Sequence, residues 1–311
     1  MPDIYFHHYL NSPFAEKVRR ILAYKNLAWH SVLQPPIMPK PELVALTGGY
    51  RRIPVLQIGA DVFCDTLLIC DVLEDIAPNP SLYPTSVYGV SRTVAAWMDN
   101  TLFSVAMAFN FGPKGAAAFF AKMPPAFATA FIEDRKAMRM GGERMNPADA
   151  TSAYKIALSR INEMVATTHQ GFICGALTSI ADFAAYHPLW FTKNIPEISG
   201  LLHEYPNIAP WMAKVAALGS DHQHESSTQA ALDVAKAGSS PFFSGQAYVD
   251  DHGIAIGSEV NIVAESFGPE LTTGKLVAAT KDRYTLERSH ELCGTVRVHF
   301  PRLGFVLKEA K

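Results

Sequence analysis

A serine near the start of the chain stands where it could contact an anion. Ser12 precedes Pro13, and this order is typical of the first residues of an α-helix. The N–H groups at such an end, with their partial positive charge, stabilise anions such as a thiolate. Ser12 could therefore donate a hydrogen bond to sulfur. No Ser/His/Asp arrangement is visible around it, which argues against a nucleophile. The alternative is that Ser12 only caps the helix.

A second candidate is the sequence Arg52-Ile53-Pro54, which leads from a loop into a predicted strand. The bond before a proline in this position is a candidate cis peptide bond. A cis bond would turn the backbone N–H and C=O of Ile53 outward, where they could pair with an extended peptide. Arg52 could hold a carboxylate. The alternative is an ordinary strand-initiating proline beside a solvated arginine pair.

A third candidate is Asp65-Thr66 at the start of the next predicted helix. The N–H groups of this helix could bind the carboxylate of an amino-acid head group, and Asp65 could bind its ammonium group. Asp and Thr are also routine helix caps, so a purely structural role is the alternative. The fourth pattern, Ser179 to Asp182, is a variant of the capping box and predicts a structural role.

The first 84 residues alternate strand and helix patterns in the order βαβ and then ββα. The predicted strands cover residues 4–6, 30–33, 54–58 and 62–64, and predicted helices begin at Pro13, Pro41 and Thr66. The first helix should bury Val18, Ile21 and Leu22 and leave its charged side chains outside, at Glu16, Lys17, Arg19 and Arg20. A proline-rich linker follows at residues 78–84.

The middle of the chain, residues 85–237, is predicted to be helical. The expected helices cover residues 87–108, 124–140, 148–168, 178–191, 208–218 and 228–237. The segment from Phe111 to Phe120 is rich in glycine and alanine and is predicted to be a mobile connection. Residues 238–241 have the composition of a hinge.

The end of the chain, residues 241–311, is predicted to contain only short strands. They are expected at residues 247–249, 259–264, 271–279, 283–287, 294–299 and 304–308, with turn residues at regular intervals. This pattern indicates a small all-β barrel-like or sandwich module. The module holds eight Lys or Arg and nine Asp or Glu, so it is not basic.

Composition excludes several classes of protein. The 311 residues are 49% hydrophobic, and 27 basic against 29 acidic residues give a net charge of −2. Such a balance argues against a nucleic-acid binder that works through positive charge. The best membrane candidate, Thr101 to Gly112, is too short to span a bilayer, and the N-terminus lacks a signal-peptide pattern. The four cysteines form neither a disulfide framework nor a zinc motif, so no metal and a cytoplasmic location are expected.

Taken together, the four patterns resemble the cytosolic glutathione transferase family. The stretch Ser12–Arg19 is similar to its first-helix signature, and Arg52–Leu56 to its K-V-P-x-L element with a cis-proline. Asp65–Ile69 is similar to the E-S-x-x-I element. Phe172–Gly175 and Ser179–Asp182 are similar to the F-L-x-G…T-x-A-D element of the helical domain. The resemblance covers residues 1 to about 220 and does not extend to the module at residues 241–311.

The resemblance implies an α/β thioredoxin-like domain at residues 1–84 and an all-α domain at residues 85–237, in a cytoplasmic homodimer that acts in detoxification. It also implies glutathione as co-substrate. In that interpretation Ser12 donates a hydrogen bond to the sulfur and favours the thiolate. The residues implied in glutathione binding are Arg52 at the glycyl carboxylate, Ile53 and Pro54 along the backbone, and Asp65 and Thr66 at the γ-glutamyl end.

Two departures from the family pattern bear on the chemistry. Asp65-Thr66 replaces the commoner Glu-Ser and keeps the same chemical groups. Serine rather than cysteine at position 12 disfavours thiol exchange through a mixed disulfide, and it favours conjugation, isomerisation or glutathione-dependent cleavage. Tyr5 lies in the first strand, where other branches of the family keep a catalytic tyrosine, and is the runner-up sulfur donor.

The second substrate is expected to be a hydrophobic electrophile bound between the domains. The helices from Val87 to Met140 offer the apolar side chains Trp97, Met98, Phe103, Met107, Phe109, Phe111 and Phe120, most of which are expected to be core. The alternative from another class of protein is a non-catalytic, glutathione-transferase-like scaffold whose β module recognises a partner.

Overall fold

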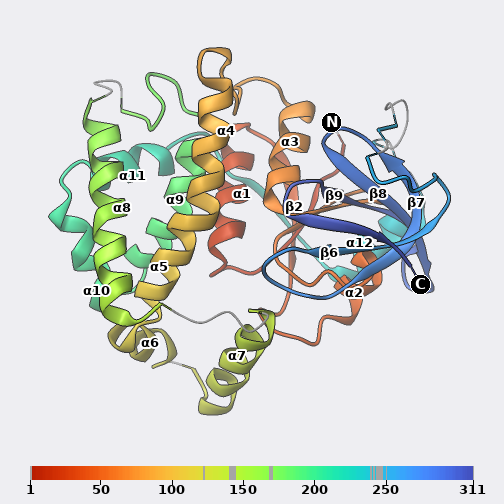
Figure 1. Cartoon of the computed structure of the whole chain (residues 1–311), viewed down its shortest axis with the longest axis horizontal. Coiled ribbons are helices and arrows are strands. Elements are labelled where there is room, and N and C mark those ends of the chain that lie inside the picture. The colour runs from red at the N-terminus through yellow and green to blue at the C-terminus, as the bar shows by residue number, and fades with distance from the viewer. Residues whose placement is uncertain are drawn as a thin grey trace.

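A ten-stranded mixed sheet runs through the molecule, and a bundle of helices packs beside one part of it (Figure 1). This computed structural model of the chain describes residues 2–121, 123–139, 145–167, 171–238, 240, 242, 248–249 and 251–310. The strand order is β10-β6-β7-β8-β9-β4-β3-β1-β2-β5. Segments from both ends of the chain therefore share one sheet.

The N-terminal unit has the predicted thioredoxin-like order. Its elements are β1 (Tyr5–His8), α1 (Pro13–Tyr24), β2 (Ala28–Leu33), α2 (Pro41–Thr47), β3 (Val55–Ile58), β4 (Asp61–Cys64) and α3 (Thr66–Ile76). Strand β1 pairs parallel with β2 and antiparallel with β3, which pairs antiparallel with β4. The βαβ and ββα halves predicted from the sequence are confirmed.

Helix α1 buries more than its apolar stripe. Val18, Ile21 and Leu22 are fully buried as predicted. The prediction that the charged face lies outside is wrong for Glu16, Lys17 and Arg19. The helical unit packs on α1 and supplies Asp99 as the partner of Lys17, whereas Arg19 bonds to Glu16 and to the backbone oxygen of Leu10. A periodicity pattern shows only the face that must be buried, and it does not reveal a second partner.

The helical unit begins after the linker. It contains η1 (Thr85–Val87), α4 (Tyr88–Trp97), the π-helical turn η2 (Met98–Leu102), α5 (Phe103–Asn110), α6 (Pro113–Phe120), α7 (Pro125–Met138), α8 (Pro147–Thr167), α9 (Ile180–Lys193), α10 (Pro196–Ser199), η3 (Gly200–Glu204) and α11 (Ile208–Ala216). Elements α4, η2 and α5 follow one another without a break and match the single helix predicted there.

The predicted mobile connection at residues 111–120 is wrong, because helix α6 occupies most of it. Pro113 begins the helix at its first turn, and the following alanines are the strongest helix formers. Gly115 lies where α6 crosses the end of α5. A Cβ atom there would lie 2.1 Å from the carbonyl oxygen of Asn110. Glycine at this position allows the backbones of α5 and α6 to approach closely, and its presence here does not indicate flexibility.

A polar segment after the helical unit returns to the sheet. Strand β5 (His222–Ser226) pairs parallel with β2, and α12 (Thr228–Lys236) follows it as the sequence predicts. The side chain of Gln57 donates a hydrogen bond to the backbone oxygen of Ala231 at 2.7 Å, which fastens α12 to the sheet. The sequence does not predict β5, since its residues are nearly all exposed and show no apolar alternation.

The strand-rich C-terminal module is confirmed, and we use this name for strands β6 to β10. They are β6 (Glu259–Ala264), β7 (Thr272–Ala279), β8 (Arg283–His290), β9 (Gly294–Pro301) and β10 (Phe305–Glu309). The strands extend the N-terminal sheet, since β9 pairs parallel with β4 and β10 lies at the far edge beside β6. The expected strand at residues 247–249 starts outside the described residues, and Tyr248 and Val249 are not in a strand. The expected hinge also falls partly outside them, at residues 239 and 241.

The N-terminal unit and the C-terminal module share one hydrophobic core. Leu43 and Leu46 of α2 and Val55 of β3 pack in the same buried cluster as Leu286 and Val298 of the module. A second cluster lies between the sheet and the helical unit. Because each core is continuous across unit boundaries, the units are held in fixed positions beside one another.

The end of α2 lies against the module. Gly49 has a φ of +139°, and a Cβ atom on it would lie 2.2 Å from the carbonyl oxygen of Leu271. Only glycine fits this conformation and this approach together. The side chain of Arg288 also donates a hydrogen bond to the backbone oxygen of Ala45 in α2. The module therefore holds the segment that leads to Arg52.

Two histidines are buried in strand β1. His7 contacts the side chain of Gln57 at 2.9 Å, and His8 contacts the hydroxyl of Ser31 at 2.8 Å. Burial lowers the pKa of His7 from 6.5 to about 4. Burial, followed by the charge of Arg19, lowers the pKa of His8 to about 3. Both rings are therefore neutral in the folded protein near pH 6.

We predict that the free energy of unfolding falls as the pH is lowered from about 6.5 to about 4. Below 6.5 the unfolded chain binds protons at His7 and His8 that the folded chain does not bind, so protonation favours unfolding. Urea titrations across this range measure the slope. The variant His7→Gln should have a shallower slope, whereas His203→Gln, at an exposed histidine, should match the wild type. Equal slopes for His7→Gln and the wild type would contradict the prediction.

Candidate functional site

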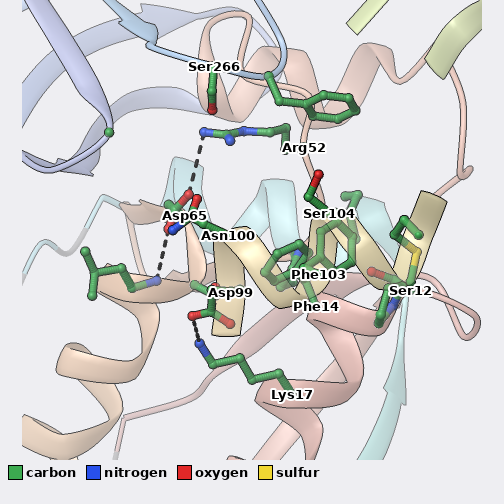
Figure 2. Close-up of a pocket in the computed structure, with 18 of the residues that line it drawn as sticks. Ser12, Phe14, Lys17, Arg52, Asp65, Asp99, Asn100, Phe103, Ser104 and Ser266 are labelled. Atoms are coloured by element: carbon green, nitrogen blue, oxygen red, sulfur yellow. Dashed lines mark hydrogen bonds and ion pairs between the residues drawn. The ribbon is translucent and has the colours of Figure 1, made fainter. Parts of the chain in front are cut away.

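A cavity of about 780 Å³ lies where the three parts of the chain meet. The N-termini of α1 and α3, the loop before β3, helices α4, α5 and α7, and loops of the C-terminal module all contribute to its lining. Figure 2 shows Ser12 on one side of this pocket and Arg52 with Asp65 on the other, with aromatic rings between them. The three patterns singled out in the sequence therefore face one space.

Ser12 caps α1 as predicted and also lines the cavity. Its Oγ accepts a hydrogen bond from the backbone N–H of Ala15 at 3.2 Å, and the residue is only 2% exposed. A hydroxyl that accepts one hydrogen bond still has its own O–H to donate. Capping and donation to a bound sulfur are thus compatible at this residue.

The peptide bond between Ile53 and Pro54 is cis, as the resemblance to the K-V-P-x-L element implies. Both residues line the cavity. They stand directly before β3, so the backbone of Ile53 lies at the end of a sheet strand.

Asp65 and Thr66 form the N-terminus of α3 and line the cavity with Leu67. The Oδ1 atom of Asp65 accepts a hydrogen bond from the backbone N–H of Leu67 at 3.0 Å. Asp65 has a φ of +74°, which a residue other than glycine rarely adopts. Such conformations are concentrated at functional sites. The helix end thus presents backbone donors and a carboxylate together.

Arg52 lies beside Asp65. Its Nη2 atom is 3.6 Å from Oδ2 of Asp65, and its guanidinium lies 5.0 Å from the ring of Tyr50 and 5.1 Å from that of Phe305. The Nε and Nη2 atoms have no hydrogen-bond partner among the described residues. This end of the cavity therefore combines an anion and a cation, an arrangement that complements an amino-acid head group.

The runner-up sulfur donor, Tyr5, is not among the described residues that line the cavity. Its ring stacks on His30 at 4.6 Å and packs against Val32 and Ala231. The tyrosine that does line the cavity from the end of β1 is Tyr9. The geometry favours Ser12 over Tyr5.

The apolar wall of the cavity contains three of the seven side chains predicted for it, Phe103, Met107 and Phe111. The other four belong to hydrophobic packing: Met98 is fully buried, Trp97 and Phe109 pack on the core, and Phe120 contacts neighbouring phenylalanine rings. The sequence did not single out Phe14, whose ring lies 4.5 Å from that of Phe103. Phe14 directly follows Pro13 at the start of α1, and this position beside Ser12 could have indicated that it lines the site.

A cluster of buried charged side chains forms part of the cavity lining (Figure 2). Lys17, only 1% exposed, places its Nζ 2.5 Å from Oδ2 of Asp99, and the other oxygen of Asp99 lies 3.1 Å from His187. Burial alone would raise the pKa of Asp99, but Lys17 and His187 hold it below the usual value. Asp99 lies in the π-helical turn η2, a rare element that is frequent at functional sites. The cluster fastens α1 to the helical unit.

A second lysine, Lys40, lines the cavity without a carboxylate partner among the described residues. It is 4% exposed, and its Nζ donates a hydrogen bond to the backbone oxygen of Arg51 at 3.1 Å. Burial, followed by the charge of Arg135, lowers its pKa from 10.5 to about 8. The sequence did not indicate Lys40, because a lysine in a proline-rich loop carries no distinctive pattern.

The C-terminal module also lines the cavity, which the sequence did not predict. Ser266 and Phe267 in the loop after β6, and Leu303 to Phe305 in the turn into β10, face it. Figure 2 shows Ser266 beside Arg52. No sequence pattern indicated these residues, because the family resemblance ends before the module begins.

Within the described parts of the chain, no three His, Cys, Asp or Glu side chains gather as metal ligands would. Among the same residues, no helix combines the length and the apolar character needed to cross a membrane.

Comparison with known proteins agrees with the geometry. Residues 6–81 match the family model "Glutathione S-transferase, N-terminal domain", and residues 125–220 match "Glutathione S-transferase, C-terminal domain". A GST-like protein from Pseudomonas syringae is 33% identical in sequence, and the alignment covers 100% of each chain with a TM-score of 0.82. This similar structure therefore extends over the residues of the C-terminal module.

Other similarities are partial. The beta-etherase LigF from Sphingobium sp. strain SYK-6 is 16% identical with a TM-score of 0.51, over 69% of this chain and 95% of that one, which shows a common fold alone. The pyrimidodiazepine synthase of Drosophila melanogaster is 33% identical over 76 residues. That match spans 23% of this chain and 31% of the synthase, less than a third of its length.

Proposed function

Because this chain belongs to the glutathione S-transferase family, we propose that it binds glutathione in the cavity and activates its thiol for attack on a hydrophobic electrophile. The observation that carries the proposal is the meeting of Ser12, Ile53 and the N-terminus of α3 around one cavity. Family membership supports glutathione binding in general. The reaction itself is our proposal.

The γ-glutamyl end of glutathione binds at the N-terminus of α3 in this proposal. Backbone N–H groups and Arg52 hold its α-carboxylate, and Asp65 holds its ammonium group. The sequence interpretation assigned Arg52 to the glycyl carboxylate. The separation of 3.6 Å between Arg52 and Asp65 supports the γ-glutamyl end instead.

Lys40 holds the glycyl carboxylate in this proposal. With its γ-glutamyl end at Asp65 and its backbone paired with Ile53, glutathione extends away from α3 in this proposal. Its glycyl end is then free to reach another part of the cavity, which Pro36 and Lys40 also line. A nearly buried ammonium group with one hydrogen bond to Arg51 keeps donors for a carboxylate. Binding such an anion would also offset the free-energy cost of burying the ammonium group of Lys40.

Ser12 stabilises the thiolate. Its hydroxyl and the partial positive charge at the start of α1 lower the pKa of the bound thiol, and the thiol proton leaves to water. The thiolate then forms a bond to the electrophilic carbon, and the displaced group departs with the electron pair of the broken bond. A serine cannot form a mixed disulfide, so the proposal contains no disulfide intermediate.

The electrophile binds against Phe14, Phe103, Met107 and Phe111. An apolar wall of this kind favours a hydrophobic substrate, because aromatic side chains bury large areas on contact. Because part of the chain is similar to a pyrimidodiazepine synthase, the proposal also includes glutathione-dependent reactions other than simple conjugation.

The alternative proposal is a non-catalytic scaffold whose C-terminal module recognises a partner. Retention on immobilised glutathione, followed by an activity screen with thiol-reactive electrophiles, separates the two functions. Binding without turnover of any electrophile would favour the scaffold. The module residues that face the cavity, Ser266 to Phe267 and Leu303 to Phe305, support the enzymatic proposal.

We predict that Ser12→Ala lowers kcat/KM for conjugation by about 10²–10³-fold, the effect of removing one preorganised donor to a developing anion. The same change removes a helix cap and should lower the free energy of unfolding by about 1 kcal/mol. Steady-state kinetics and the pH titration of the bound thiolate by ultraviolet absorbance measure the first effect. Thermal melting measures the second.

A matched variant separates capping from catalysis. Ser227 caps α12 with the same kind of bond, from the N–H of Ala230 at 3.1 Å, and does not line the cavity. Ser227→Ala should therefore lose similar stability and keep full activity. If Ser12→Ala also keeps full activity and an unchanged thiol pKa, Ser12 is only a cap.

We predict that Lys40→Gln raises the KM for glutathione about tenfold or more, because a charge-assisted hydrogen bond to the glycyl carboxylate is lost. The KM for γ-glutamylcysteine, which lacks the glycyl residue, should change little. Kinetics with both thiols measure the difference. Lys136→Gln, at an exposed lysine of α7, is the matched control. Equal effects of Lys40→Gln on both thiols would contradict the assignment.

A further inference from the structure

The C-terminal module reaches the end of the cavity where Arg52 and Asp65 lie. Its loop of residues 265–271, between β6 and β7, contributes Ser266 and Phe267, and the turn before β10 contributes Leu303 to Phe305. In Figure 1 the module lies on the opposite side of the molecule from the helical bundle, and α7 lies between them. The module thus forms a wall that the N-terminal and helical units do not supply.

The loop of residues 265–271 joins an arginine of the N-terminal unit to the helical unit. Oε1 of Glu270 lies 2.6 Å from Nε of Arg51, and the backbone N–H of Gly268 donates a hydrogen bond to the oxygen of Met138 at 2.9 Å. Arg51 also pairs with Asp134 of α7 at 2.7 Å. The backbone segment that carries Arg52 is therefore fixed from two sides.

Phe305 acts on Arg52 directly. This ring is 5% exposed and lies 6.2 Å from the ring of Tyr50, and the guanidinium of Arg52 is about equally far from both rings. Aromatic faces attract a guanidinium without using its N–H donors. Nε and Nη2 of Arg52 are buried and have no hydrogen-bond partner among the described residues, so the two rings and the ion pair with Asp65 position the guanidinium.

We propose that the C-terminal module is a working part of the thiol-binding site. Phe305 and Glu270 are positioning residues. Phe305 holds Arg52 for the α-carboxylate of the thiol co-substrate, and Glu270 holds the neighbouring Arg51 and with it the backbone that carries Arg52. This inference rests on the proposed function, in which that co-substrate is glutathione. It assigns the additional strands a role in selecting the thiol, a role that requires no separate partner.

The proposal predicts a particular kinetic signature. Arg52 and Ser12 lie on different sides of the cavity (Figure 2), so a change in the orientation of Arg52 alters thiol binding more than thiolate chemistry. Variants of the positioning residues should therefore raise the Kd and KM for glutathione and leave kcat nearly unchanged. A general loss of structure would lower kcat as well.

The experiment compares Phe305→Leu with Phe305→Tyr in the full chain. Leucine keeps an apolar side chain but loses the aromatic face, and tyrosine restores it. Phe305→Leu should weaken glutathione binding about tenfold by calorimetry, in line with a desolvated cation–π contact, with kcat within about twofold of the wild type. Phe305→Tyr should bind like the wild type.

Two further variants make the test independent of folding at position 305. Glu270→Gln removes the ion pair with Arg51 and keeps the shape of the side chain, and it should weaken glutathione binding about threefold, as for one partly exposed ion pair. Leu292→Ala changes an exposed side chain in the turn between β8 and β9 of the same module and should have no effect. Thermal melting of each variant accompanies the binding data, and if Phe305→Leu fails to fold, Glu270→Gln decides.

The outcomes separate this inference from the proposed function. If the wild type binds glutathione and both Phe305→Leu and Glu270→Gln bind it equally well, the module has no positioning role and the proposed function stands. A fall in kcat with unchanged Kd would likewise overturn the positioning role. If the wild type itself does not bind glutathione, the proposed function fails and this inference fails with it.

Discussion

The site depends on the N-termini of two helices opening at the same edge of the sheet. Strand β1 leads into α1 and β4 leads into α3, and both strands run in the same direction, because each is antiparallel to β3. Their helices therefore start on one side. Ser12 and Asp65 cap these ends, and Ile53 lies between them at the start of β3. Donors from two helix ends and one loop thus converge on one ligand.

The C-terminal module shows how an added segment becomes part of an existing site. The outer edge of β4 offers unpaired backbone groups, and β9 satisfies them by parallel pairing. His299 of β9 also lies 2.8 Å from Asp61 of β4 within the buried interior. The shared core holds the module beside the N-terminal unit, and loops of the module line the cavity.

Buried charge accompanies this architecture. Lys17, Asp99 and Lys40 all line the cavity, and burial lowers the pKa of Lys40 to about 8. Desolvation makes such groups costly unless each meets an opposite charge or a ligand. Lys17 has that partner within the protein. Lys40 is the group whose partner we assign to glutathione.

The sequence by itself determined the order of elements in the first 84 residues and the caps at Ser12 and Asp65, because these depend on local periodicity and on residues with special backbone preferences. The bond before Pro54 was only a candidate cis bond in the sequence, and the structure shows that it is cis. Only the tertiary structure decided that Lys17 is buried, that Tyr5 lies away from the cavity and that Phe305 contacts Arg52. Those facts depend on which surfaces pack together across long separations in the chain, and local patterns carry no record of that packing.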